Sequence, residues 1–123
     1  TAKKIEERVP GVKVNVYPLE DEQKLYEKIG ESHILVNATK VGMKPMEEES
    51  LIKDTRVFRE NLVVADAVYN PRETKMLQEA QAAGCKIALG GIGMLLRQGE
   101  AAFRIFTGEN MPTEEVYEKF FRE

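Results

Sequence analysis

The chain has 123 residues, 42% hydrophobic and 32% charged, which is the balance of one globular domain and not of a disordered chain. Its net charge of -3 argues against a duplex nucleic-acid binder, and no apolar run is long enough to span a membrane. One cysteine and one histidine exclude a disulfide framework and a Cys- or His-rich metal centre. No signal peptide precedes the first element, so we expect a cytoplasmic protein, and the start at Thr1 without Met indicates a processed or truncated piece.

The apolar pattern alternates along the chain between helical and extended periods. In chain order it predicts a helix over residues 2–9, a strand over 12–19, a helix over 20–29 ended by Gly30, a strand over 33–37, a strand over 61–69, a helix over 74–83 ended by Gly84, a strand over 86–89, a helix over 94–106 closed by Gly108, and an amphipathic helix from Thr113. The nearly continuous apolar run at 33–37 is typical of a strand buried on both faces. In the 74–83 helix we expect Met76, Leu77, Ala80 and Ala83 to face inward.

Strands that alternate with helices predict an α/β fold with a mostly parallel, doubly wound sheet. In such sheets ligands bind beyond the carboxyl ends of the strands. The segments to search are therefore residues 37–44, 67–72 and 90–93.

Three side chains and three glycines in or near these segments are candidates for ligand contact. Lys40 is suited to a phosphate or a polar nucleotide edge, although a solvated lysine in a crossover loop is the simpler interpretation. The Tyr69 hydroxyl is suited to a polar substrate, with a tyrosine at the core edge as the alternative. Glycines at 90, 91 and 93 open a helix and suit close approach to a ring or a phosphate. Gln98, one turn past Met94, either points into the same cleft or is an exposed amide.

Three further residues have simpler interpretations. Cys85 is expected to be a small packed residue, because no histidine lies near it in sequence to activate a thiol. His33, at a strand start, is expected to be structural. Asp66 is unusual inside an apolar strand, and both a bond to backbone amides and a functional role remain open for it.

Six motifs in order and at fixed spacing resemble the carboxyl-terminal half of the shikimate dehydrogenase family. They are NATKVGM (37–43), VYNPRETK (68–75), AGCK (83–86), GIGM (91–94), QG (98–99) and FRIFTG (103–108). The run TKVGMKP (39–45) is similar to the quinate/shikimate dehydrogenase branch, in which a lysine replaces the more common serine. The resemblance covers residues 12 to 112.

The resemblance implies an NAD- or NADP-linked oxidoreductase that interconverts 3-dehydroshikimate and shikimate, or dehydroquinate and quinate, in aromatic amino-acid biosynthesis. The nicotinamide would perform the hydride step, and the protein would position it. By family pattern, Lys40 and the four residues Ala67, Val68, Tyr69 and Asn70 border the cofactor. Gly91 and Met94 border its nicotinamide, and Tyr69 and Gln98 touch the hydroxylated substrate.

The sequence also departs from the family pattern. The substrate domain with its catalytic Lys/Asp pair and the glycine-rich pyrophosphate turn have no counterpart in the chain. We therefore expect a partial Rossmann-type NAD(P)-binding domain without its first strands, no catalytic residue within it, and no dehydrogenase turnover by the chain alone.

Two other hypotheses accompany this one. A free-standing, receiver-like signalling module fits the size and the acidic pair Glu20-Asp21, but no strand-end aspartate stands at Asn37. The second hypothesis concerns the missing strands, whose loss would leave an open edge beside residues 34–37. That edge predicts either direct pairing with residues 12–17 or a homo-oligomer.

Overall fold

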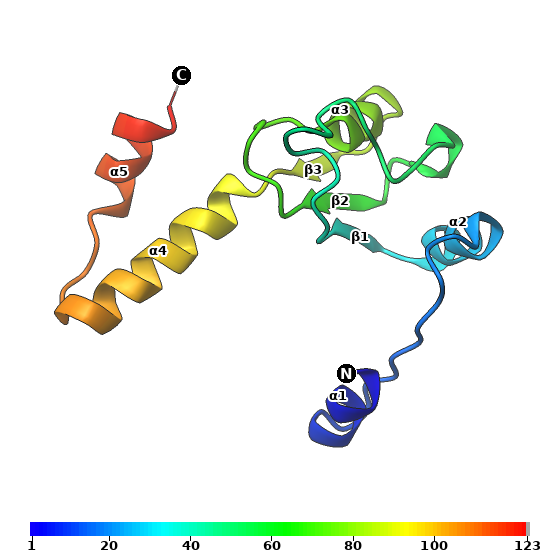
Figure 1. Cartoon of the computed structure of the whole chain (residues 1–123), viewed down its shortest axis with the longest axis horizontal. Coiled ribbons are helices and arrows are strands. Elements are labelled where there is room, and N and C mark those ends of the chain that lie inside the picture. Colours follow the sequence, from blue (N-terminus) through cyan, green and yellow to red (C-terminus); the bar gives the residue numbers. More distant parts are fainter. Residues whose placement is uncertain (123) are drawn as a thin grey trace. The chain divides into compact units, whose positions relative to one another are not determined.

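The computed structural model describes residues 1–122, which form two compact units (Figure 1). The first unit spans Thr1–Ser32, and the second begins at His33. The first unit contains helices α1 (Ala2–Arg8) and α2 (Glu22–Glu31). The second contains strands β1 (Ile34–Asn37), β2 (Val63–Asp66) and β3 (Ile87–Leu89), the 3-10 helix η1 (Thr55–Val57), and helices α3 (Lys75–Ala82), α4 (Ile92–Thr107) and α5 (Thr113–Phe120).

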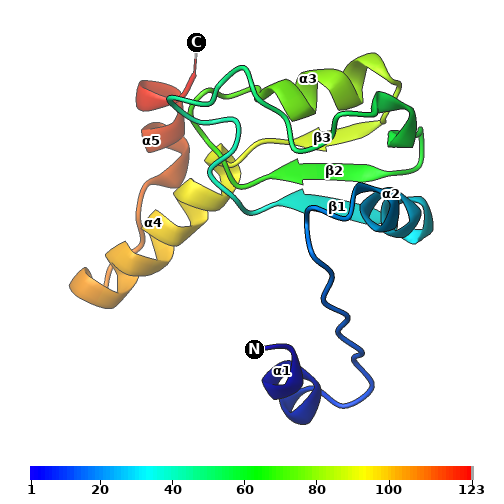
Figure 2. The same ribbon diagram turned by 45° about the vertical axis from the view of Figure 1, so that its right-hand side comes forward.

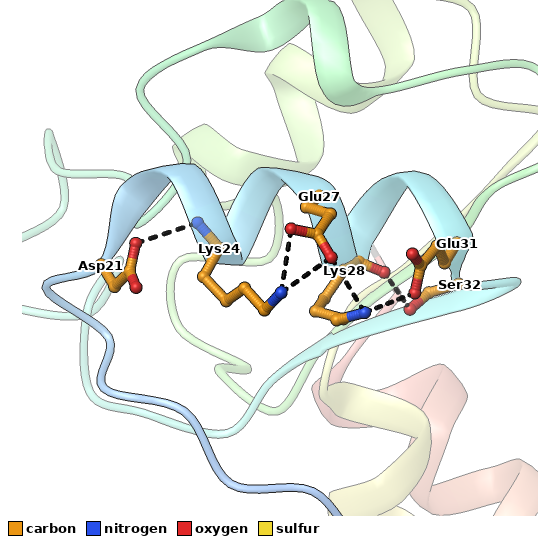
Figure 3. Close-up of polar contacts among 6 residues, drawn as sticks. All are labelled: Asp21, Lys24, Glu27, Lys28, Glu31 and Ser32. Carbon is orange, nitrogen blue, oxygen red and sulfur yellow. Dashed lines mark hydrogen bonds and ion pairs between the residues drawn. The ribbon is translucent and has the colours of Figure 1, made fainter.

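Helix α2 is held by local polar contacts along one face (Figure 3). The Asp21 side chain accepts a hydrogen bond from the Lys24 amide at 3.0 Å, which satisfies one free donor of the first turn. Lys24 Nζ lies 2.8 Å from Glu27, and Lys28 Nζ lies 2.7 Å from Glu31. Hydrogen bonds from Lys24 and then Lys28 lower the pKa of Glu27 below its ordinary value. These pairs stabilise the exposed helix only modestly.

Two expectations for this first unit are wrong. Residues 12–19 form no strand, and Val16 among them is 77% exposed. A strand needs a neighbour to take its main-chain hydrogen bonds, and Thr1–Ser32 contains no strand that could serve. Gly30 does not end α2 either, because the helix continues to Glu31 and the Ser32 hydroxyl donates to the Lys28 carbonyl at 2.6 Å.

The second unit is built on a three-stranded parallel sheet in the order β1-β2-β3. The register places Asn37, the last residue of β1, opposite Asp66, the last residue of β2. Parallel strands require crossover connections, which here contain η1 and α3. The parallel α/β architecture predicted from the sequence is confirmed, although β2 is shorter than the expected 61–69.

Helix α3 packs on one face of the sheet, against β2 and β3 (Figure 2). Leu62, Val64 and Thr74 are the largest fully buried side chains among the described residues, with less than 2% of each exposed. The inward positions Met76, Leu77 and Ala80 are confirmed. Ala83 is exposed and caps the helix before Gly84, whose positive φ of 91° only glycine adopts readily.

The opposite face of the sheet carries exposed aliphatic side chains. Ile34 is 60% exposed and Val36 is 56% exposed, so the expected burial of β1 on both faces is wrong. Period-2 alternation explains the difference, because Leu35 and Asn37 share the face on which α3 packs and their neighbours point the other way. An apolar run alone does not show whether both faces are covered.

The last two helices confirm the expected pattern, with small shifts of their ends. Helix α4 begins at Ile92, two residues before the expected start, and Gly108 closes it with a φ of 78°. Helix α5 begins at Thr113 as expected, and it contacts α4. In the described part of the chain, no helix has the length and apolar content needed to cross a bilayer.

Candidate functional site

A cavity of about 200 Å³ lies at the carboxyl ends of β1 and β2. Two loops line it, and each follows one of these strands. The lining residues are Thr39, Met43, Lys44, Ala67, Val68, Tyr69 and Asn70. This is the edge of a parallel sheet at which ligands bind.

Hydrogen bonds to the Asn37 side chain fix the first loop. Its Oδ1 accepts from the Thr39 amide at 3.0 Å and from the Thr39 hydroxyl at 2.8 Å. Its Nδ2 donates to the Val41 carbonyl at 2.9 Å. Gly42 follows with a φ of 97°, and a Cβ there would lie 3.2 Å from Thr74. Because glycine has no side chain and adopts this positive φ without strain, the loop can lie close to the segment that follows β2.

The second loop leaves the sheet directly after Asp66. The Asp66 carboxylate accepts from the Val68 amide at 2.9 Å, which turns the chain at the strand end. Tyr69 follows, 49% exposed at the cavity, and the Asn70–Pro71 peptide bond is cis. This turn places an exposed phenol beside Thr39 and Met43 of the first loop.

The glycine segment after β3 packs against the second loop. The Gly91 amide donates to the Val68 carbonyl at 3.0 Å. A Cβ on Gly91 would overlap with the Ala67 carbonyl oxygen, and one on Gly90 would lie 2.8 Å from the Arg72 carbonyl oxygen. The two glycines thus allow close packing of backbone on backbone at the start of α4.

The structure brings together some of the residues singled out in the sequence and not others. Ala67, Val68, Tyr69 and Asn70 line the cavity, and Gly91 is buried against Ala67. Lys40 is exposed and adjoins Thr39 without lining the cavity. Met94 is 48% exposed on α4, and Gln98 is exposed one turn further along the same helix. The roles of these residues toward ligands stay predictions.

Three lining residues were missed by sequence reasoning: Thr39, Met43 and Lys44. All three lie within the 37–44 segment that the strand-end rule selected. No pattern in the 37–44 segment shows that these three side chains face the cavity and that of Lys40 does not. The course of the loop decides which side chains line it.

The simpler interpretations of Cys85 and Asp66 have a structural basis. Cys85 is 8% exposed, and its thiol lies 3.2 Å from the Arg59 carbonyl, as expected of a packed cysteine. Asp66 is 4% exposed and bonds a backbone amide. No group of three or more potential metal ligands occurs among residues 1–122.

A parallel sheet with a cavity at its carboxyl edge, beside a helix with a glycine N-cap, defines a Rossmann-like α/β domain. Residues 91–119 match the Shikimate 5'-dehydrogenase C-terminal domain. The shikimate dehydrogenase (NADP(+)) of Streptococcus uberis is 45% identical over 123 residues, which is 100% of this chain and 41% of that enzyme.

Among solved structures, the chain is similar to shikimate and quinate dehydrogenases. Shikimate 5-dehydrogenase from Listeria monocytogenes, in complex with shikimate and NAD, matches 98% of this chain with a TM-score of 0.90 and 40% identity. Quinate dehydrogenase from Corynebacterium glutamicum, in complex with NAD, matches 97% with a TM-score of 0.80 and 32% identity. The chain spans 41% of the Listeria chain and 40% of the Corynebacterium chain. The chain belongs to the shikimate dehydrogenase family and corresponds to a carboxyl-terminal portion of it.

Proposed function

We propose that this chain supplies part of the cofactor and substrate cleft of an NAD(P)-dependent shikimate or quinate/shikimate dehydrogenase. The reaction is hydride transfer between 3-dehydroshikimate and shikimate, or between the corresponding quinate pair. The observation that carries the proposal is the cavity at the carboxyl ends of β1 and β2, lined by Tyr69 and its neighbours. Relatives that share this portion were solved with shikimate and NAD in one case, and with NADP(H) and shikimate in another.

The size of the cavity fits one end of the cofactor. Cavities that enclose a whole drug-sized ligand measure about 300–1,000 Å³, whereas this one measures about 200 Å³. It therefore suits a single ring with its amide, such as nicotinamide, and not a complete dinucleotide. The nicotinamide, when bound, supplies the hydride acceptor or donor.

The residues have separate roles in this proposal. Lys40 and the stretch from Ala67 to Asn70 border the cofactor, and Gly91 and Met94 border its ring. Tyr69 and Gln98 orient the substrate hydroxyl groups by hydrogen bonds. The chain itself contributes no proton-transfer residue, because the resemblance places the Lys/Asp pair in the part of the relatives that this chain does not match. We therefore expect no turnover by the chain alone.

A chimera tests these roles. In it, this chain replaces the matching stretch of the Streptococcus uberis enzyme, to which it is 45% identical. Tyr69→Phe removes the hydroxyl and should raise the KM for shikimate about tenfold, the effect of one lost hydrogen bond. Met94→Ala should raise the KM for NADP+ and leave the KM for shikimate nearly unchanged.

Tyr117→Phe is the matched control, because Tyr117 lies on α5 and does not line the cavity. It should leave both KM values unchanged. The proposed roles are wrong if Tyr69→Phe and Tyr117→Phe have the same effect on the KM for shikimate.

A further inference from the structure

A single buried carboxylate ties together the two loops that line the cavity. Asp66 is 4% exposed, and both of its oxygens lie 3.1 Å from Asn37 Nδ2. It also accepts from the Val68 amide at 2.9 Å and from the Thr74 hydroxyl at 2.7 Å. Every one of these neighbours is a donor, so an acceptor-only group satisfies them all. An amide at this position would turn an NH₂ group toward other donors.

The orientation of Asn37 is fixed by the same network. Its Oδ1 takes two hydrogen bonds from Thr39, so its Nδ2 must face both the Val41 carbonyl and Asp66. One side chain thus connects the loop after β1 to the carboxylate that ends β2. Asn37 is 4% exposed, so its amide lies out of water.

Thr74 shows that the network is not simply helix capping. It is the N-cap residue of α3, and a threonine there commonly accepts from an amide of the first turn. In this protein Thr74 makes no such side-chain bond and is fully enclosed, with its hydroxyl donating to Asp66. Its methyl side faces Gly42, where a Cβ would lie 3.2 Å away. The Thr74 hydroxyl therefore bonds to Asp66 at the strand end and not to an amide in the first turn of α3.

The network extends to the third strand through the backbone. Asp66 holds the Val68 amide, and the Val68 carbonyl in turn accepts from the Gly91 amide at 3.0 Å. Gly91 is the N-cap residue of α4. Asp66 is therefore connected to all three segments that follow the strands, although its own side chain does not line the cavity.

We propose that Asn37, Asp66 and Thr74 are positioning residues, which hold the cavity loops in one arrangement and thereby set the affinity for the nicotinamide cofactor without touching it. The inference rests on the proposed function, because it concerns the same cavity. Removing one acceptor leaves several donors unsatisfied in a buried place, and the loops must move to satisfy them.

Amide hydrogen exchange in the 123-residue chain tests the structural half. Asp66→Asn should accelerate exchange together at Thr39, Val41, Val68 and Gly91 by about tenfold or more. Thr74→Val should act in the same direction, and Thr74→Ser, which keeps the hydroxyl, should resemble the unsubstituted chain. Acceleration confined to Val68 would overturn the proposal, because the loops would then not be coupled.

Kinetics of the chimera test the functional half. Asp66→Asn and Thr74→Val should each raise the KM for NADP+ about tenfold, whereas Thr74→Ser, which keeps the hydroxyl, should have a nearly normal KM. Val64→Ala is the stability control, since Val64 is fully buried in the same strand and lies outside the network. Partial unfolding lowers the active fraction, so Val64→Ala should reduce the maximal rate without changing the KM.

Two outcomes separate this inference from the proposed function. If Asp66→Asn lowers only the maximal rate, as Val64→Ala does, the three residues are structural and the inference fails. If the unsubstituted chimera folds but is inert, the proposed function fails, and the assignment of these residues as positioning residues for cofactor fails with it. The exchange experiment still decides whether they couple the loops.

Discussion

Gly91 packs so closely against Ala67 that a methyl group on residue 91 would overlap with the Ala67 carbonyl oxygen. The contact joins the start of α4 to the loop that follows β2, at the cavity edge. It gives a physical reason for glycine at this position that needs no ligand. A ligand bound on the other side of Gly91 would add a second reason for glycine at this position.

The first prediction follows from this contact. Gly91→Ala should lower the free energy of unfolding by about 1–3 kcal/mol, because overpacked backbone must shift to admit the methyl group. Gly93→Ala, two residues along, is the matched control, because a Cβ there meets nothing within 4 Å. Its effect should be neutral or stabilising by up to about 1 kcal/mol. Urea unfolding of both variants checks the difference, and equal effects would contradict the packing argument.

The second prediction concerns the acidity of Asp54. Hydrogen bonds from the Arg56 side chain, at 2.8 and 2.7 Å, and then from the Arg56 amide lower the pKa of Asp54 to about 2 from an ordinary 3.8. Because the folded pKa is depressed, the stabilisation is present above pH 3.8 and is lost as the pH falls toward 2. Both groups are near the surface, so the effect on overall stability should be small.

Carboxyl carbon shifts measured by NMR through an acid titration check this value. Arg56→Gln should move the Asp54 midpoint up toward 3.8, since both side-chain bonds from the guanidinium are removed. An Asp54 midpoint that stays the same with and without Arg56 would show that the ion pair does not persist in solution.

The third prediction concerns the open edge of the sheet. Within the described residues of the second unit, β1 pairs only with β2, so its other edge presents unpaired main-chain groups. Pairing of this edge with residues 12–17, the alternative considered from the sequence, stays a prediction. Exposed edges recruit other strands, and we predict that the isolated chain self-associates through β1.

Sedimentation velocity over a range of concentrations tests the association. Val36→Lys places a charge on β1 and should shift the chain toward monomer. Val16→Lys is the control, because Val16 is 77% exposed and lies in no helix or strand. A chain that stays monomeric at every concentration, with rapidly exchanging β1 amides, would refute self-association.

Local patterns in the sequence predicted the elements that depend on local signals. Glycines follow α3 and α4, and α5 has acidic residues in its first turn, so local signals predict the positions of these helices to within about two residues. The 12–19 strand was wrong because a strand depends on a partner that lies elsewhere in the chain. The exposure of Ile34 and Val36 was missed for the same reason, since burial depends on what covers the sheet.

The cavity residues of the second loop were named individually from the sequence, whereas those of the first loop were predicted only as a segment. The strand-end rule selected the loops after β1 and β2, and the cavity lies between them. The bond between Asn37 and Asp66 spans 29 residues of sequence, so no local pattern reveals it. The sequence shows Asp66 as an unusual acid in an apolar strand. Nothing in the sequence indicates that the Thr74 hydroxyl bonds to Asp66 and does not cap α3.

The most direct test of the central claim is shikimate-dependent reduction of NADP+, measured side by side for the 123-residue chain and for the chimera with the remainder of the Streptococcus uberis enzyme. We predict turnover by the chimera and none by the chain alone, because in the proposed function the chain supplies one wall of the cleft and the remainder supplies the proton-transfer pair. Turnover by the chain alone, or a folded chimera that reduces no cofactor, would contradict the account.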